Sequence, residues 1–188
     1  MVVVLKKPPP QRFAAAVPQK INRIAMAVTP TSSLQDKARI QFVRHETSHP
    51  DFIMLVDHLN KELAARDGAE HAFYDQFNSL ELLRHKILGY QGNTAVCCGA
   101  FKVLDSKRIE IKRMYTLPEY RGNGFALELL NALEAWAVSI GFDTAVLETG
   151  KRQPEAIALY KKAGYKLIEN YGPYKGVENS VCFEKKLD

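Results

Sequence analysis

The stretch Arg121-Gly122-Asn123-Gly124-Phe125-Ala126 lies between a strand-like run and the clearest amphipathic helix of the chain. Glycine and asparagine adopt positive φ readily, so this turn can make successive backbone N–H groups converge on one point. The helix that follows adds the positive end of its dipole, and Arg121 adds a cationic side chain. The small residues Gly124 and Ala126 let an anion approach the backbone. The stretch therefore predicts an anion-binding turn at the start of a helix.

Two common phosphate-binding motifs do not fit this turn. A Walker loop needs Gly-Lys followed by Ser or Thr, and the sequence has no such run. A dinucleotide fingerprint needs a small residue three positions after its second glycine, where Leu127 stands. Taken alone, the turn is also compatible with a purely structural role as a glycine-rich start of a helix.

Hydrophobic patterns on both sides of the turn predict a mixed α/β chain. Apolar residues at three- and four-residue spacing predict helices, and short apolar runs bounded by turn residues predict strands. The expected helices are residues 51–66, 79–84, 123–140 and 154–164. The expected strands are residues 40–44, 86–91, 94–103, 108–116, 144–148, 165–168 and 180–184. The close spacing of the strands between 86 and 116 predicts an antiparallel meander.

The helix after the turn has one apolar face, and Gly141 stands where a helix end favours a left-handed residue. The residues of that face are Ala126, Leu129, Leu130, Leu133, Trp136, Ala137 and Ile140.

Residues 1–38 differ in composition from the rest of the chain, because they contain several prolines and no acidic residue before Asp36. Residues 1–39 hold seven of the 26 basic residues, so the remainder is close to neutral although the formal net charge is +5. We expect a flexible basic tail at 1–38, or upstream sequence before a later start such as Met26, and a single domain at 39–188. A nucleic-acid- or membrane-binding arm is the alternative for the tail. The neutral domain predicts no nucleic-acid partner, and the short apolar runs predict no membrane span.

The cysteines and histidines predict neither a disulfide framework nor a metal site. Cys97 and Cys98 are adjacent on an expected strand, so they point to opposite faces, and Cys182 lies far along the chain. We expect three buried thiols in a reducing cytosol. No metal is expected, because the histidines show no ligand spacing; they are His45, His49, His58, His71 and His85.

The spacing R-x-x-G-x-A between a strand and an amphipathic helix resembles the coenzyme A motif of the GNAT superfamily of N-acyltransferases. Residues 147–150 and 155–165 resemble that family's next strand and its A-I-x-L-Y-x-x-x-G-[FY] segment. The likeness covers residues 40–188 in element order and is most specific over 108–165. It implies the GNAT acyl-CoA N-acyltransferase fold, with a central, mostly antiparallel sheet of splayed strands flanked by helices. It also implies acetyl-CoA as co-substrate.

The resemblance assigns expected roles to residues on both sides of the turn. The main chain of Met114, Tyr115 and Thr116 would pair with the pantetheine arm like an added strand, with the N–H near Met114 as oxyanion donor. Gln153 stands where the family often has asparagine and is expected to contact the pantetheine. The expected pyrophosphate ligands are Arg121, Gly122, Asn123, Gly124, Phe125 and Ala126.

Two residues are expected to carry proton transfer. Tyr160 matches the family tyrosine that protonates the departing thiolate, and a phenol has a suitable pKa for this role; its alternative role is that of a packed helix aromatic. Glu110 is the expected base, acting directly or through water. By strand alternation Glu110, Lys112 and Met114 share a face. The alternative is that Glu110 pairs with Lys112 or Arg113 and only shapes the site.

The acceptor pocket is expected near Glu148, Tyr171, Tyr174 and Ser180. The resemblance implies transfer of an acetyl group from acetyl-CoA to a primary amine of a small-molecule acceptor. We expect direct attack in a ternary complex, because no cysteine is placed for a ping-pong route. The alternative is a coenzyme A-binding regulatory module without turnover. The acceptor stays open, because a fold does not name a substrate. We expect a cytoplasmic enzyme and leave a homodimer open.

Overall fold

The computed structural model describes residues 40–68, 80 and 83–188. The expected tail at 1–38 lies outside these residues, and so do 79, 81 and 82 of the short helix expected at 79–84; the described residues 80, 83 and 84 are not helical. The helices are α1 (Pro50–Asp67), α3 (Phe125–Ser139) and α4 (Pro154–Lys162), with 3-10 turns η2 (Pro118–Tyr120) and η3 (Gly172–Tyr174). The strands are β1 (Gln41–His45), β2 (His85–Gln91), β3 (Thr94–Val103), β4 (Arg108–Thr116), β5 (Thr144–Gly150), β6 (Lys166–Ile168) and β7 (Ser180–Lys186).

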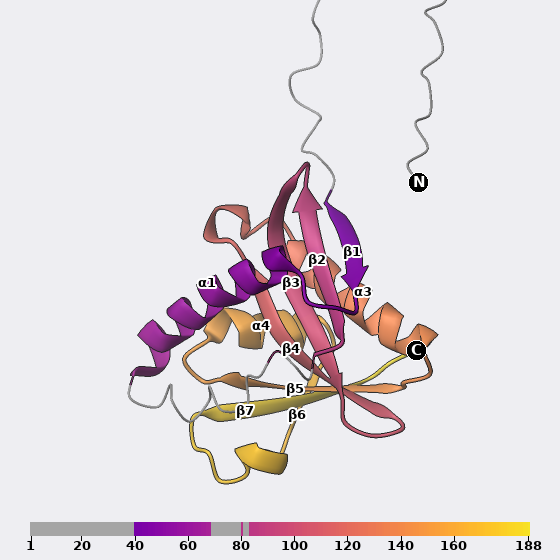
Figure 1. Cartoon of the computed structure of the whole chain (residues 1–188). Coiled ribbons are helices and arrows are strands. Elements are labelled where there is room, and N and C mark those ends of the chain that lie inside the picture. The colour runs from indigo at the N-terminus through magenta and orange to yellow at the C-terminus, as the bar shows by residue number, and fades with distance from the viewer. Residues whose placement is uncertain (1–39, 69–79, 81–82) are drawn as a thin grey trace, which may run out of the picture. The chain divides into compact units, whose positions relative to one another are not determined.

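The strands form one sheet in the order β1-β2-β3-β4-β5-β7-β6 (Figure 1). The pairs β1–β2, β2–β3 and β3–β4 are antiparallel, which confirms the expected meander. The pair β4–β5 is parallel, and α3 forms the crossover that a parallel connection requires.

Each face of the sheet has its own hydrophobic core. The apolar stripe of α3 packs on one face, where Leu129, Leu133 and Trp136 are buried, and α4 contributes Tyr160 to the same cluster. The first turns of α1 bury Phe52 and Leu55 against the other face. Helices therefore flank the sheet on both sides, as Figure 1 shows.

Cys97 belongs to the core beneath α3 and Cys98 to the core beneath α1, so the two thiols do point to opposite faces. Gly141 has a φ of 100°, as expected of a left-handed helix end. The expectation for Ile140 was wrong, because α3 ends at Ser139 and Ile140 leaves the helical stripe with 46% of its surface exposed.

The parallel pair β4–β5 separates after a short contact. Only three residue pairs join the strands, and Glu110↔Val146 is the last of them, although β4 continues to Thr116 and β5 to Gly150. The strands are therefore splayed, which confirms the expected fold class of a mostly antiparallel, splayed sheet between helices. None of the helices in the described ranges is long and apolar enough to cross a membrane.

Candidate active site

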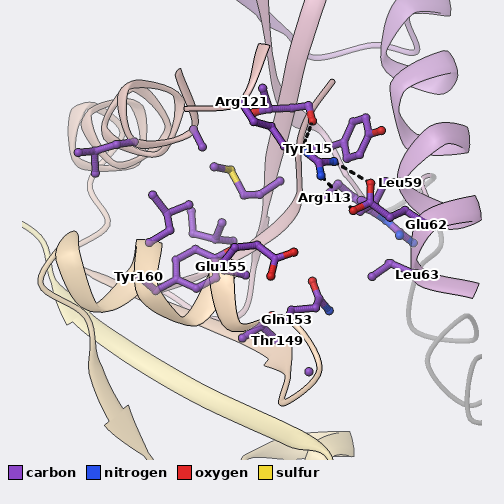
Figure 2. A pocket seen from close by; sticks show the side chains of 18 of the residues that line it. Leu59, Glu62, Leu63, Arg113, Tyr115, Arg121, Thr149, Gln153, Glu155 and Tyr160 are labelled. Carbon is purple, nitrogen blue, oxygen red and sulfur yellow. Dashed lines mark hydrogen bonds and ion pairs between the residues drawn. The ribbon is translucent and has the colours of Figure 1, made fainter. Parts of the chain in front are cut away.

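A cavity of about 510 Å³ opens where β4 and β5 separate. Its wall is formed by the second half of β4, the turn before α3, the end of β5, the start of α4 and the last turns of α1 (Figure 2). Among the expected cofactor residues, all but Asn123 line it; they are Met114, Tyr115, Thr116, Arg121, Gly122, Gly124, Phe125, Ala126, Gln153 and Tyr160. The splay of one strand pair thus brings together residues that are more than 40 positions apart in the sequence.

The glycine turn has the backbone conformation that an anion site needs. Gly122 has a φ of 77° and Gly124 a φ of 86°, and a Cβ at Gly122 would meet no atom within 4 Å. Gly124 caps α3, and its carbonyl accepts from the N–H groups of Leu127 and Glu128 at 3.0 and 3.1 Å. The N–H groups of Phe125 and Ala126, at the first two helical positions, precede the first hydrogen bond of the helix. The helix begins at Phe125 rather than at Asn123 as expected, because Gly124 is left-handed.

Asn123 closes the turn from behind and is not part of the cavity wall. Its Nδ2 donates to the carbonyl oxygens of Tyr120 and Arg121 at 3.0 and 3.3 Å. The side chain therefore stabilises the backbone of the turn, and the glycines on either side of it, Gly122 and Gly124, line the cavity.

The side chain of Arg121 is held by α1. Its Nη1 and Nη2 lie 3.2 and 2.7 Å from the two carboxylate oxygens of Glu62, and its Nε donates to the carbonyl of Thr116 at 2.9 Å. The guanidinium also lies 5.5 Å from the centre of the Tyr115 ring. These hydrogen bonds from Arg121 lower the pKa of Glu62 below its ordinary value. Figure 2 shows this pair on the wall of the cavity.

A second arginine extends this charge cluster to α4. Arg66 Nη2 lies 2.8 Å from Glu62, and Arg66 Nη1 forms an ion pair with Glu155 at the start of α4. Sequence reasoning missed Glu62 and Arg66, although their i, i+4 spacing on α1 predicts an ion pair. That spacing could not predict that the pair faces the glycine turn, because α1 and the turn meet only in the folded sheet.

A β-bulge interrupts β4 beside the cavity. Cys98 pairs with Tyr115, but Ala100 pairs with Lys112, so β4 has one residue more than β3 over this stretch. The extra residue gives Arg113 a φ of 58°, a conformation that costs free energy for a non-glycine residue. Opposite the bulge stands Gly99, where a Cβ would lie 2.7 Å from the sulfur of Met114.

The bulge corrects the expectation that Glu110, Lys112 and Met114 share a face. Ile111 and Met114 both pack on the core beneath α3, so Met114 lies on the face opposite to Lys112. The extra residue reverses the alternation of side chains after Lys112.

Glu110 is buried behind the cavity wall, with 5% of its surface exposed. The hydroxyls of Tyr171 and Tyr174 donate to its Oε1 at 3.0 and 3.3 Å, and Lys112 Nζ lies 3.6 Å from the same oxygen. Lys112 Nζ also donates to the Tyr174 hydroxyl at 2.8 Å. Glu110 does not line the cavity, whereas Lys112 and Tyr174 do.

Burial disfavours the charged forms of Lys112, Tyr171 and Tyr174. Burial lowers the pKa of Lys112 and raises the pKa values of Tyr171 and Tyr174. The nearby charge of Glu110 raises the two tyrosine pKa values further. Of the other expected acceptor residues, Glu148 lines the cavity, and Ser180 Oγ donates to Glu148 Oε1 at 2.7 Å from behind it.

Tyr160 lies on the α4 side of the cavity with 6% of its surface exposed. Its ring packs against Tyr165 and Phe183 with centroids 5.8 and 6.3 Å away. Burial raises the pKa of Tyr160, so the phenol stays protonated at neutral pH. Gln153 precedes α4, and its Nε2 lies 3.4 Å from the position of a Cβ on Gly150.

No group of three or more potential metal ligands occurs within residues 40–68, 80 and 83–188. His71 lies outside these ranges. The three cysteines are free and buried, and none of them lines the cavity.

Comparison with known proteins identifies a family. Residues 52–165, more than half of the chain, match the family described as Acetyltransferase (GNAT) family. The chain is 34% identical over 102 residues to a protein named IAA acetyltransferase from Azospirillum brasilense, across 54% of this chain and 67% of that protein. It is 33% identical over 100 residues to the uncharacterized N-acetyltransferase YsnE of Bacillus subtilis, across 52% of this chain and 66% of YsnE.

Solved structures share the fold. A proposed acyl-CoA N-acyltransferase from Klebsiella pneumoniae superposes with a TM-score of 0.67 and 29% identity, over 79% of this chain and 98% of that one. A GNAT acetyltransferase from Elizabethkingia anophelis with acetyl-CoA bound gives a TM-score of 0.59 at 19% identity, over 80% of this chain and all of that one (100%), which bears on the fold alone. The family match, the curated relatives and the splayed sheet agree, and this chain therefore belongs to the acetyltransferase (GNAT) family of acyltransferase enzymes.

Proposed function

We propose that this chain transfers the acetyl group of acetyl-CoA to a primary amine of a small-molecule acceptor by direct attack in a ternary complex. The observation that carries the proposal is the cavity between β4 and β5, which has the glycine turn along one wall and Tyr160 along another. The names of the relatives, IAA acetyltransferase and N-acetyltransferase YsnE, support an acetyl transfer.

The residues present fit acetyl-CoA. The positive φ angles of Gly122 and Gly124 and the open space in front of Gly122 leave room for a pyrophosphate at the N-terminus of α3. The main chain of β4 beyond Glu110 does not pair with β5, so an extended pantetheine arm can hydrogen-bond there. Acetyl-CoA supplies an activated thioester, and the chain's own residues bind it, orient it and move the protons.

The proton transfers suit the groups at the cavity. A protonated Tyr160 can donate to a departing thiolate. The amine of the acceptor must lose a proton, and Glu110 is buried, so we infer that the proton reaches it through Tyr174, whose hydroxyl contacts both Glu110 and the cavity wall. The placement of the cysteines supports direct attack, since none of the three lines the cavity.

Calorimetric titration with acetyl-CoA, followed by a thiol-release assay on a panel of small amines, tests the proposal. We expect binding and amine-dependent release of coenzyme A. Binding without release on any amine would instead favour a regulatory coenzyme A-binding module, and absence of binding would contradict both functions.

A further inference from the structure

The bulge in β4 has an electrostatic consequence at the cavity. Ile111 and Met114 both pack on the core beneath α3, so the two residues between them lie toward the other face, where α1 packs. These residues are Lys112 and Arg113, and both line the cavity. The bulge thus places two consecutive cations beside the main chain at which the sheet splays.

Both cations are positioned by neighbours on different elements. Arg113 is 7% exposed, and its Nη1 donates to Asn60 Oδ1 on α1 at 3.0 Å. Figure 2 shows Arg113 beside Leu59 and Leu63 of that helix. Lys112 is held from the opposite side by the Tyr174 hydroxyl at 2.8 Å. Arg113 has a φ of 58° at the bulge, and its side-chain hydrogen bond to α1 is among the contacts that offset the cost of this conformation.

Carboxylates balance these cations at separate places. Glu110 lies 3.6 Å from Lys112, behind the wall, and Glu148 lines the cavity from β5. Among the residues that line the cavity, β4 therefore contributes the cations Lys112 and Arg113 and β5 contributes the carboxylate Glu148, while Glu110 of β4 lies behind the wall. Electrostatic complementarity favours a ligand with the same separation of opposite charges.

We propose that the acceptor is an amino acid, a primary amine that also carries a carboxylate, with the carboxylate at Lys112 and Arg113 and the amine toward Glu148. This inference rests on the proposed transfer to an amine and names the acceptor class of the same cavity. A polyamine is disfavoured, because its second ammonium would lie against Lys112 and Arg113. A guanidinium beside an ammonium is a suitable receptor for a carboxylate.

The first experiment compares acceptors that differ only in the carboxylate. Thiol release from acetyl-CoA is measured with the proteinogenic L-amino acids, β-alanine and γ-aminobutyrate, and with the carboxamide and the decarboxylated amine of each. We expect kcat/KM for the preferred amino acid to exceed that of its carboxamide and its decarboxylated amine by roughly 10- to 100-fold, the range of a charge-assisted hydrogen bond. Equal or faster release with the carboxylate-free amines would overturn the inference while leaving acetyl transfer intact.

The second experiment removes each cation. Arg113→Asn is chosen because asparagine adopts a positive φ more readily than other residues, which protects the fold. Arg113→Asn and Lys112→Met should each lower the ratio of kcat/KM for the amino acid to kcat/KM for its carboxamide roughly 10- to 100-fold. Because Lys112 also contacts Tyr174, any general loss of turnover in Lys112→Met affects both acceptors and leaves this ratio unchanged. Lys166→Met, at an exposed position on β6, is the control. Equal losses on both acceptors in the two cavity variants would overturn the assignment of a carboxylate subsite.

The third experiment separates this inference from the proposed function. The amino acids are titrated calorimetrically into wild-type protein saturated with coenzyme A. If no amine supports thiol release, acetyl transfer is contradicted, but amino-acid binding that Arg113→Asn weakens would still support the subsite. Absence of amino-acid binding together with absence of amino-acid turnover would overturn it.

Discussion

Arg121 Nη2 lies 2.7 Å from Glu62 Oε2, so the turn that begins α3 is joined to α1 on the wall of the cavity. Arg121 is also the cation expected to contact the pyrophosphate. Two carboxylate oxygens already hold its guanidinium, and an incoming phosphate would compete with them.

Glu62→Gln should raise the affinity for acetyl-CoA by roughly 3- to 10-fold, because it removes a negative charge near the phosphate site and frees Arg121. Calorimetric titration measures the change, and Glu169→Gln at an exposed site is the matched control. A loss of affinity would instead show that Glu62 positions Arg121 for the phosphate.

The same ion pair predicts how stability depends on pH. Arg121 lowers the pKa of Glu62 in the folded protein below its ordinary value of 4.5. A carboxyl with a lowered folded pKa adds stability above its unfolded pKa and loses it as pH falls through the folded pKa. As the pH decreases below about 4.5, the melting temperature of the wild type should therefore drop more steeply than that of Glu62→Gln. Thermal melts of both proteins between neutral and acidic pH check this, and parallel curves would contradict it.

Tyr160→Phe should lower kcat by roughly 100-fold or more if the phenol protonates the thiolate, while the dissociation constant of acetyl-CoA stays nearly unchanged. Tyr165→Phe is a matched control, because Tyr165 is equally buried and packs against Tyr160 but does not line the cavity. Steady-state kinetics and calorimetry provide the two readouts. Unchanged turnover in Tyr160→Phe would leave this tyrosine with a packing role.

Gly124→Val should abolish acetyl-CoA binding, because valine at a φ of 86° is strained and its side chain would occupy the approach to the first turn of α3. Gly141→Val at the other end of the helix is the control, since Gly141 has a φ of 100° and does not line the cavity. Both variants should lose stability by about 1 to 2 kcal/mol. Only the first should lose binding, and equal binding in the two variants would remove the turn from the cofactor site.

Gly99→Ala should destabilise the fold by about 1 to 3 kcal/mol, because the added Cβ would lie 2.7 Å from the sulfur of Met114. Urea unfolding measures the loss. In a Met114→Ala background the same change should cost less, since the clashing sulfur is gone. An identical cost in both backgrounds would show that the strain arises elsewhere, for example at Leu133, whose Cδ1 would lie 2.9 Å away.

Local chemistry made much of the fold predictable from the sequence. The sequence signals of these elements depend on residues that are close to one another in the chain. They are the apolar stripes of α1 and α3, the turn residues between β2, β3 and β4, and the prolines and glycines at helix ends. The glycine turn belongs to the same class, because positive φ at Gly122 and Gly124 is a property of glycine itself. The turn at 121–126 and the segment at 155–165 were therefore sufficient to indicate the family.

The arrangement around the reacting groups depended on the tertiary structure. The bulge at Arg113 arises from the pairing of β3 with β4, and the missing side chain of Gly99 leaves room for the sulfur of Met114. Strand alternation alone therefore assigned Met114 to the wrong face of the sheet. Likewise the contact between Arg121 and Glu62, and the burial of Glu110 behind Tyr174, join residues from distant parts of the chain. The sequence by itself determined which helices and strands form and indicated the family, because the elements and the glycine turn rest on local backbone preferences. Only packing across the sheet decided which charges face the cavity, because burial and pairing are properties of the whole fold.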